Sequence, residues 1–395
     1  MESWNWHNEK NVGGVERYGL RLADNLVSRG IQTSIYTGPN YLDLPDGKIC
    51  KIEGGNVSYP VFYHKDASHM LNSLEEDAIS QKINLIELEG FYGIRSNHNI
   101  MERVLGLDVP LIFTSHNSGL LNKKNLYREL CIDFAKIFTD RVDAIICVSS
   151  KLGEDAIEFG FSPEKVHVIY NPIDEQVFHP VSETEKIALR KELGLPLDKK
   201  IIMYAGRISP EKGSEFLLRS WNEVHDAIPN SHLLVAGGIA PSTEKPLQDL
   251  FAQFKIDCQN DQTASFTDGF IKDEAKLAKY YQACDIFILP SPAEGLGNVL
   301  LEAMLCGKPC IISEIARASS GAGDLVTSGF NGTTFKDYTP EALITAIREI
   351  KNNMGTCGLI KAKNMGVGIS SVTDEHIKLY QELVHGKPFS VAMIT

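Results

Sequence analysis

The sequence predicts an α/β protein built from two doubly wound, Rossmann-like domains that face each other across a cleft. At 395 residues the chain exceeds what a single hydrophobic core usually holds, so two domains are expected. Short apolar strands alternate with helical patterns throughout, which is typical of βα units and parallel sheets. A polar stretch from Asn171 to about Leu195, punctuated by prolines, separates the two series and predicts the domain boundary.

In the first domain a helix is expected from Val15 to Arg29, because Leu20, Ala23 and Leu26 recur at helical spacing and Gly30 follows. Four apolar runs predict the strands of this domain: Ile31–Tyr36, Leu85–Leu88, Leu111–Thr114 and Ala144–Val148.

The second domain repeats the pattern. Its expected strands are Lys200–Ala205, His232–Ala236, Asp285–Leu289 and Pro309–Ile312. Its expected helices include Ser214–His225 and Asp273–Cys284, and the last helix of the chain is expected over Asp374–Leu383. In such sheets ligands bind outside the carboxyl ends of the strands, so functional residues are expected there.

The segment Ser291–Met304 follows one of these strands and opens a helix. It carries two carboxylates separated by seven residues, Glu294 at the loop tip and Glu302 about one turn into the helix. Asn298 is the expected N-cap, so backbone N–H groups would point out of the turn toward a phosphate or a polar sugar. One carboxylate can accept hydrogen bonds from sugar hydroxyls and the other from a ribose. The loop residues expected to contact the donor are Gly295, Leu296, Gly297 and Asn298. The alternative is an ordinary strand-to-helix turn with a solvated glutamate.

A second segment, Tyr204–Gly213, also lies between a strand and a helix. It brings two cations, Arg207 and Lys212, to the mouth of the second domain, where they suit a diphosphate. The alternative is a solvated loop with a salt bridge.

Three weaker signals complete the set. Gly13 and Gly14 open the first long helix and leave room for a ligand against the backbone. Gly238 and Ile271 follow strands of the second domain and are candidates for framing a nucleotide base, although ordinary turns are equally consistent with them. His116 lies just past a strand end, where a structural role is the alternative.

The Glu-x7-Glu spacing with its glycine-rich filling resembles the donor-sugar motif of retaining glycosyltransferases of the GT-B fold, family 4. The segment Gly206–Gly213 closely resembles the Gly-Arg…Glu-Lys-Gly segment of the same family. Many members have proline where Gly297 stands. Asn117 replaces an acidic residue that is common in the family, which leaves open whether His116 has a charged partner.

This resemblance implies transfer of a hexose or N-acetylhexosamine from a nucleotide diphosphate sugar to an acceptor hydroxyl, with retention at the anomeric carbon. Residues 1–172, joined by a C-terminal helix at about 372–395, would form the acceptor-side domain, and residues 173–371 the domain that binds the nucleotide sugar. Arg207 and Lys212 would stabilise the leaving diphosphate, and His116 would sit near the transferred sugar. Glu294 would orient the sugar hydroxyls and Glu302 would hold the ribose. Gly13 and Gly14 would reach toward the donor phosphates.

Composition excludes other classes. A net charge of −12 argues against a nucleic-acid-binding protein. Eight cysteines without a Cys-x-x-Cys pair are expected to be reduced and buried. No signal peptide and no membrane-spanning run are visible, so a cytoplasmic protein is expected. Contact with the inner face of the membrane stays open, because cations share a helical stretch with Leu and Phe: Lys123, Lys124, Arg128, Lys136 and Arg141.

No Asp-x-Asp and no His/Cys cluster with metal-ligand spacing occurs, so no metal and no cofactor are expected besides the donor, for which a UDP-sugar is favoured over a GDP-sugar. The expected acceptor is a carbohydrate or a lipid-linked molecule, in surface polysaccharide, glycolipid or other glycoconjugate biosynthesis. Two alternatives remain, a non-hydrolysing nucleotide-sugar epimerase and a catalytically silent sugar-nucleotide-binding protein.

Overall fold

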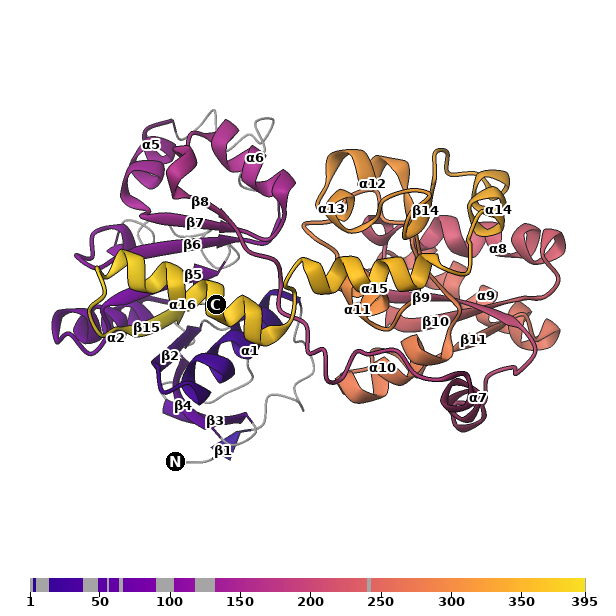
Figure 1. Cartoon of the computed structure of the whole chain (residues 1–395), viewed down its shortest axis with the longest axis horizontal. Helices are drawn as coiled ribbons and strands as arrows, with labels where there is room; N and C mark the ends of the chain where they lie inside the picture. Colours follow the sequence, from indigo (N-terminus) through magenta and orange to yellow (C-terminus); the bar gives the residue numbers. More distant parts are fainter. Residues whose placement is uncertain are drawn as a thin grey trace. The chain divides into compact units, whose positions relative to one another are not determined.

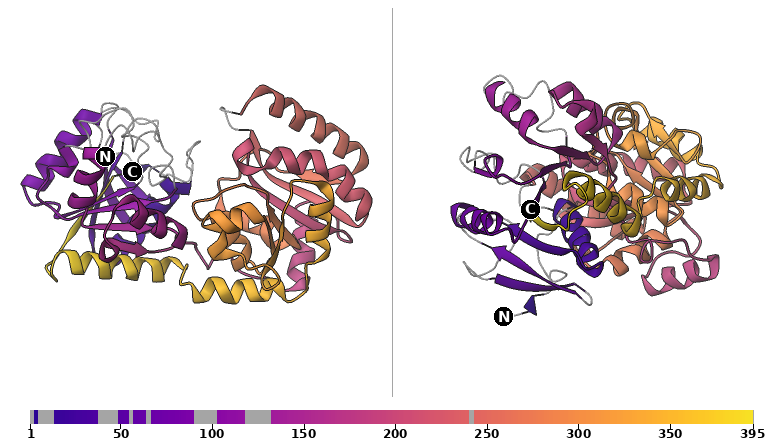
Figure 2. Two further views of the ribbon diagram at one scale, coloured as in Figure 1. Left: turned by 90° about the horizontal axis from the view of Figure 1, so that it is seen from above. Right: turned by 60° about the vertical axis from the view of Figure 1, so that its left-hand side comes forward.

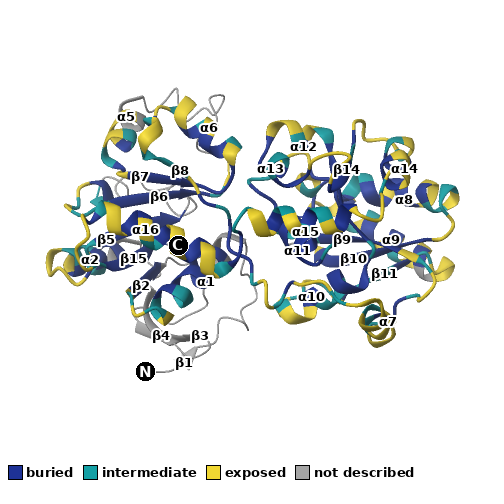
Figure 3. Cartoon of the chain, in the orientation of Figure 1, coloured by how far each residue is buried: buried dark blue, intermediate teal, exposed yellow. Residues whose placement is uncertain are grey.

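The computed structural model describes residues 3–4, 14–37, 49–54, 57–63, 67–89, 103–117, 132–239 and 243–394. The chain forms two compact units (Figure 1). The N-terminal unit comprises residues 1–172 and 368–395, and the C-terminal unit comprises residues 173–367. Most strands whose burial is described are buried in each unit, and the outer helix faces are exposed (Figure 3). The predicted α/β class with two Rossmann-like sheets is confirmed.

The N-terminal unit contains a sheet in which nine described strands follow the order β1-β3-β4-β2-β15-β5-β6-β7-β8. Their bounds are Ser3–Trp4 (β1), Gln32–Thr37 (β2), Ile49–Gly54 (β3), Val57–Tyr63 (β4), Leu85–Glu89 (β5), Leu111–Ser115 (β6), Ala144–Cys147 (β7), Val166–Val168 (β8) and Ser390–Ile394 (β15). Strands β3 and β4, which were not predicted from the sequence, pair antiparallel. Only two residues connect them, and a parallel pair needs a much longer crossover.

Strand β15 comes from the end of the chain and lies between β2 and β5, parallel to both. Val391 and Met393 are fully buried in the core of this unit. The expectation of a helix over about 372–395 is wrong for this segment, because the helix ends at Leu383 and a strand follows. A five-residue run is ambiguous by itself.

Two helices, α1 (Gly14–Ser28) and α16 (Ile369–Leu383), pack on one face of the N-terminal sheet (Figures 1 and 2). They are linked by Arg29, which pairs with Asp374 and donates 2.8 and 2.9 Å hydrogen bonds to the hydroxyl and carbonyl of Ser370. Helix α16 begins five residues before its predicted start. The other described α-helices of this unit are α2 (Ala67–Ile79), α5 (Ile132–Arg141) and α6 (Ser150–Phe159).

The C-terminal unit contains six parallel strands in the order β11-β10-β9-β12-β13-β14. Their bounds are Lys200–Ile208 (β9), Ser231–Ile239 (β10), Ala264–Phe266 (β11), Ile286–Leu289 (β12), Cys310–Ser313 (β13) and Gly332–Phe335 (β14). One face is covered by α8 (Ser214–Ala227), α9 (Lys245–Asp261) and α14 (Pro340–Arg348). The opposite face carries α10 (Glu274–Ala283), α11 (Asn298–Leu305) and α15 (Met354–Asn364) (Figure 2). The short helices α12 (Glu314–Ser319) and α13 (Ala322–Leu325) follow β13.

Strands β9 and β10 are longer than predicted, so Arg207 and Gly238 lie inside strands and not after them. The two strands continue side by side because Gly237 has no side chain. A Cβ at this position would lie only 1.9 Å from the carbonyl oxygen of Gly206.

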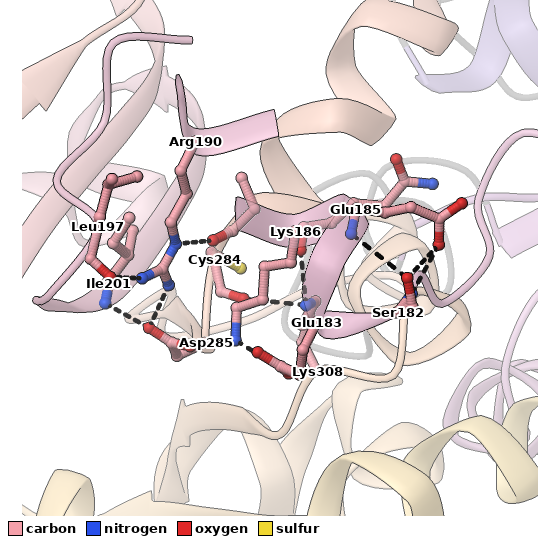
Figure 4. A network of polar contacts seen from close by, with 12 residues as sticks. Ser182, Glu183, Glu185, Lys186, Arg190, Leu197, Ile201, Cys284, Asp285 and Lys308 are labelled. Atoms are coloured by element: carbon pink, nitrogen blue, oxygen red, sulfur yellow. Dashed lines mark hydrogen bonds and ion pairs between the residues drawn. The ribbon is translucent and has the colours of Figure 1, made fainter. Parts of the chain in front are cut away.

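The polar boundary stretch contains helix α7 (Glu183–Glu192), which the sequence analysis missed although Ser182 and Glu185 form a capping box. This helix is attached to the start of β12 through Asp285 (Figure 4). Lys186 and Arg190 lie 2.6 and 2.7 Å from the Asp285 carboxylate. Burial opposes ionisation of Asp285, but these cations and the Ile201 N–H outweigh it and lower the pKa of the carboxyl group.

Candidate active site

The two main motifs meet because β9 and β12 are adjacent and parallel. After β9 the chain forms a 3₁₀ turn, Pro210–Lys212, and then α8. After β12 it forms the loop of residues 290–297 and then α11. Both segments therefore leave the same edge of the sheet, at the carboxyl ends of the strands, where ligands bind in doubly wound folds.

Lys212 and Glu294 form a direct ion pair at this edge. The ammonium nitrogen lies 2.7 Å from Oε1 and 2.8 Å from Oε2 of Glu294. The side chain of Lys212 is 26% exposed and that of Glu294 only 9% exposed. Glu294 is therefore not the solvated glutamate of the alternative interpretation, and its charge is balanced inside the loop.

The loop that carries Glu294 is held by buried serines. The hydroxyl of Ser291 lies 2.9 Å from the carbonyl oxygen of Glu211 and 2.8 Å from that of Ala293. The hydroxyl of Ser313 donates to the carbonyl of Ser291 at 2.8 Å. The amide of Gly321 donates to the carbonyl of Glu294 at 3.1 Å. These contacts hold the backbone at Glu294 in place, and the sequence analysis did not identify Ser313 or Gly321.

Helix α11 begins differently from the prediction. Gly297 is the N-cap, with φ of 95°, and Asn298 is the first helical residue. The expectation that Asn298 caps the helix is therefore wrong, because glycine alone adopts this left-handed conformation without strain. No side chain caps the helix, and the N–H of Leu300 donates to the carbonyl of Gly297 at 2.8 Å. Proline, common in the family at position 297, cannot adopt a positive φ.

Neighbouring loop residues differ in exposure. Leu296 is 2% exposed and anchors the loop in the interior, whereas Gly295 is partly exposed next to Glu294. The predicted contacts of Gly295, Leu296, Gly297 and Asn298 with a donor remain predictions.

Glu302 is buried inside the C-terminal unit, with 4% of its surface exposed. Its Oε2 accepts a 2.9 Å hydrogen bond from the hydroxyl of Tyr281 on α10. Burial, followed by the charge of Glu302, raises the pKa of Tyr281 well above its usual value, so this hydroxyl remains a donor. The two carboxylates of the motif thus have different environments, and sequence analysis did not identify Tyr281.

Arg207 is exposed near the end of β9, paired in register with Gly238 of β10. Its carbonyl oxygen accepts a 2.5 Å hydrogen bond from Tyr204. Unlike Lys212, Arg207 forms no ion pair with any residue that the structure describes. Its guanidinium, which pairs with no carboxylate of the described residues, lies at the same edge of the sheet as the Lys212–Glu294 pair.

The predicted base-framing segments also meet. A Cβ at Gly238 would lie 3.1 Å from Cα of Gly269, in the turn that precedes Ile271. Thr267 fastens this turn, since its hydroxyl accepts from the amide of Gly237 at 3.0 Å and donates to the carbonyl of Gly269 at 2.8 Å. Ile271 is half-buried. The sequence analysis did not identify Thr267.

His116 belongs to the N-terminal unit and follows β6, with its side chain 5% exposed. Burial, and secondarily the charge of His376, lowers the pKa of His116 to about 3, so the imidazole is neutral at ordinary pH. Gly14 is the first residue of α1. Gly13 lies outside the described residues, so the structure says nothing of its predicted role.

Among the described residues, no three His, Cys, Asp or Glu side chains gather as a set of metal ligands. In the same part of the chain, no helix combines the length and the apolar character needed to cross a membrane. Six cysteines of the described residues are free: Cys147, Cys258, Cys284, Cys306, Cys310 and Cys357.

Comparison with known proteins assigns the family. The model for Glycosyltransferase Family 4 matches residues 12–177, and the model for Glycosyl transferases group 1 matches residues 185–366. An uncharacterized glycosyltransferase of Methanocaldococcus jannaschii is 26% identical over 368 residues, covering 90% of this chain and 89% of that protein. D-inositol 3-phosphate glycosyltransferase 1 of Catenulispora acidiphila is 24% identical over 411 residues, covering 95% and 92%.

Solved structures agree on the fold. Anabaena HepE in complex with UDP-glucose matches with a TM-score of 0.70 at 17% identity, covering 95% of this chain and 97% of that one. Sucrose-phosphate synthase from Thermosynechococcus elongatus matches with a TM-score of 0.72 at 20% identity, covering 95% of both chains. The resemblance inferred from the motifs is confirmed. The chain therefore belongs to glycosyltransferase family 4 and is a glycosyltransferase of the GT-B fold.

Proposed function

We propose that the protein transfers a hexose or N-acetylhexosamine from a UDP-sugar to an acceptor hydroxyl, with retention and without a metal ion. The observation that carries this proposal is the Lys212–Glu294 ion pair, which lies directly ahead of the uncapped helix α11. Two solved relatives support the donor class, since Anabaena HepE is bound to UDP-glucose and the pneumococcal O-GlcNAc transferase GtfA to UDP and GlcNAc.

The leaving group of this reaction is a diphosphate, whose negative charge grows as the bond to the sugar breaks. Lys212, Arg207 and the first N–H groups of α11 would stabilise that charge. An ammonium group has three donors, so Lys212 can keep one hydrogen bond to Glu294 and give others to phosphate oxygens. Glu294 would then accept hydrogen bonds from the sugar hydroxyls, and Glu302 from the ribose.

Retention is proposed from the family resemblance, and the state of these two carboxylates bears on its route. Glu294 is engaged by Lys212, and Glu302 is buried against Tyr281. Neither is therefore placed as a nucleophile, and front-face attack assisted by the departing phosphate is the proposed route. The N-terminal unit would bind a carbohydrate or lipid-linked acceptor and supply His116, in a pathway of surface polysaccharide, glycolipid or other glycoconjugate biosynthesis.

Purified protein incubated with UDP-, GDP- and ADP-sugars and candidate acceptors tests this proposal. Mass spectrometry should detect a glycosylated acceptor with a UDP-sugar, and nuclear magnetic resonance should show the anomeric configuration of the donor. Lys212→Ala serves as the impaired control. Conversion of the donor without an acceptor would instead indicate an epimerase, and tight donor binding without UDP release would indicate a silent binding protein.

A further inference from the structure

One face of the N-terminal sheet carries a buried row of polar side chains. Glu87 and Glu89 alternate along β5 and therefore point to the same face. Thr114 and His116 have the same spacing on the neighbouring strand and just past its end, and Glu89 pairs in register with Thr114. This places each carboxylate beside one polar side chain of the adjacent segment.

Glu87 has a structural role in this row. Its Oε1 accepts a 2.6 Å hydrogen bond from Thr114, and its Oε2 accepts a hydrogen bond from Tyr380 of α16. Both Glu87 and Tyr380 are fully buried. These contacts fasten α16 to the sheet and satisfy the carboxylate.

Glu89 stands beside His116. Its Oε2 lies 3.9 Å from Nε2 of His116, and its side chain is fully buried. The ring of Tyr18 lies edge-on to the imidazole, with centroids 4.7 Å apart and an interplanar angle of 76°. Asn117, which replaces the acidic residue common in the family, is uncharged. A carboxylate from the preceding strand thus lies close to His116, whose charged partner the sequence left open.

The hydrogen bonds of His376 and Tyr18, which lie near His116, indicate where the protons of these two groups lie. Nδ1 of His376 lies 2.7 Å from the carbonyl of Val372, which can only accept, so Nδ1 carries the proton. In the neutral ring, Nε2 of His376 then accepts the 2.6 Å hydrogen bond from the hydroxyl of Tyr18. Tyr18 therefore directs its proton to His376 and not to His116.

We propose that Glu89 is a positioning residue that holds His116 in the tautomer with the proton on Nε2, leaving Nδ1 as an acceptor for a substrate hydroxyl. An ionised carboxylate accepts hydrogen bonds only, so with Glu89 ionised the facing nitrogen, Nε2, must carry the proton. A shift of about 1 Å brings the pair to hydrogen-bonding distance, and such bonds commonly tighten when substrate binds. This proposal rests on the proposed function of His116 in sugar transfer.

The tautomer of His116 can be measured on the intact protein, and this measurement does not depend on enzymatic activity. A long-range proton–nitrogen spectrum of the histidine side chains at neutral pH, with His116→Ala to assign the signal, should show Nε2 protonated and Nδ1 not. In Glu89→Gln the signal should move toward the other tautomer. Glu75→Gln, which removes a carboxylate elsewhere in the same unit, should leave it unchanged. A proton on Nδ1 in the wild-type protein overturns the proposal.

Kinetics provide the second test. Glu89→Gln should lower kcat roughly 10- to 100-fold with the donor KM unchanged, because the imidazole loses its fixed orientation. The double variant Glu89→Gln/His116→Ala should be no slower than His116→Ala, since Glu89 acts only through His116. Multiplicative losses would show that Glu89 acts independently and would overturn the proposal. Full turnover in His116→Ala would instead refute the proposed function of His116, while the spectrum still tests the Glu89–His116 pair.

Discussion

Lys212→Ala should lower turnover by roughly 10²- to 10³-fold, which corresponds to about 3–4 kcal/mol of transition-state stabilisation. The substitution removes an ammonium nitrogen that lies 2.7 and 2.8 Å from the two oxygens of Glu294. The ground-state ion pair contributes only about 1 kcal/mol or less, since the side chain of Lys212 is 26% exposed. The kinetic effect should therefore greatly exceed any loss of stability.

Donor affinity separates the roles of the two partners. In Lys212→Ala, Glu294 keeps its charge without a cation and repels the diphosphate, so UDP should bind more weakly. In Glu294→Gln, Lys212 is released from its partner. UDP should then bind no more weakly than to wild type, while turnover falls because hydrogen bonds to the sugar hydroxyls weaken. The double variant should recover UDP affinity relative to Lys212→Ala but not turnover.

Isothermal titration with UDP and a UDP-release assay measure the two quantities, and thermal melting monitors the fold. Near-wild-type turnover in Lys212→Ala would show that the diphosphate binds elsewhere. Loss of UDP binding in Glu294→Gln, together with unchanged binding in Glu302→Gln, would show that the roles of the two carboxylates are reversed.

Four further outcomes are expected. Glu302→Gln should weaken UDP binding by about 1–2 kcal/mol, because a charged hydrogen bond to the ribose is lost; unchanged titration curves would refute this. Activity should survive EDTA, since Lys212, Arg207 and helix N–H groups balance the phosphate charge; loss that manganese restores would contradict it. Removal of residues 389–395 deletes β15 from between β2 and β5, so calorimetry should lose the transition of the N-terminal unit; two unchanged transitions would argue against this placement. Asp285→Asn should destabilise the C-terminal unit at pH 7. Because folding lowers the pKa of Asp285, its contribution to the free energy of unfolding is fully present above the unfolded pKa of about 3.9. That contribution is lost as the pH falls through the lower pKa of the folded state. The difference in the free energy of urea unfolding between wild type and Asp285→Asn should therefore shrink at lower pH.

Much of the fold could be predicted because buried parallel strands are continuous apolar runs. Leu85–Leu88 and Leu111–Thr114 were located to within one residue for this reason. Helix α7 was missed because its face toward solvent is polar, although the Ser182 to Glu185 spacing of a capping box was visible. Strand β15 was missed because its partners, β2 and β5, lie hundreds of residues earlier in the chain, and local pattern carries no information on such pairing.

The residues of the site likewise fall into those that the sequence could predict and those that it could not. Arg207, Lys212, Glu294 and Glu302 could be proposed from spacing, since each follows a predicted strand. Their partners could not, because Tyr281 and Ser313 come from other elements. Glu89 could have been identified from the sequence, because two glutamates alternate in the buried run Leu85–Glu89 and buried carboxylates generally have specific partners.

The burial of Glu302 has a consequence for how the donor would be bound. Tyr281 orients this carboxylate before any ligand arrives, and helix α11 supplies a rigid backbone. Glu294, in contrast, lies on a loop whose backbone is fixed by Ser291 and Gly321, and its charge is balanced by Lys212, whose side chain is 26% exposed. Ribose recognition would then require little reorganisation, whereas the sugar-binding side would exchange partners as the diphosphate enters. Nucleotide affinity should therefore depend mainly on the preorganised Glu302, and turnover mainly on the redistribution of hydrogen bonds between Lys212 and Glu294.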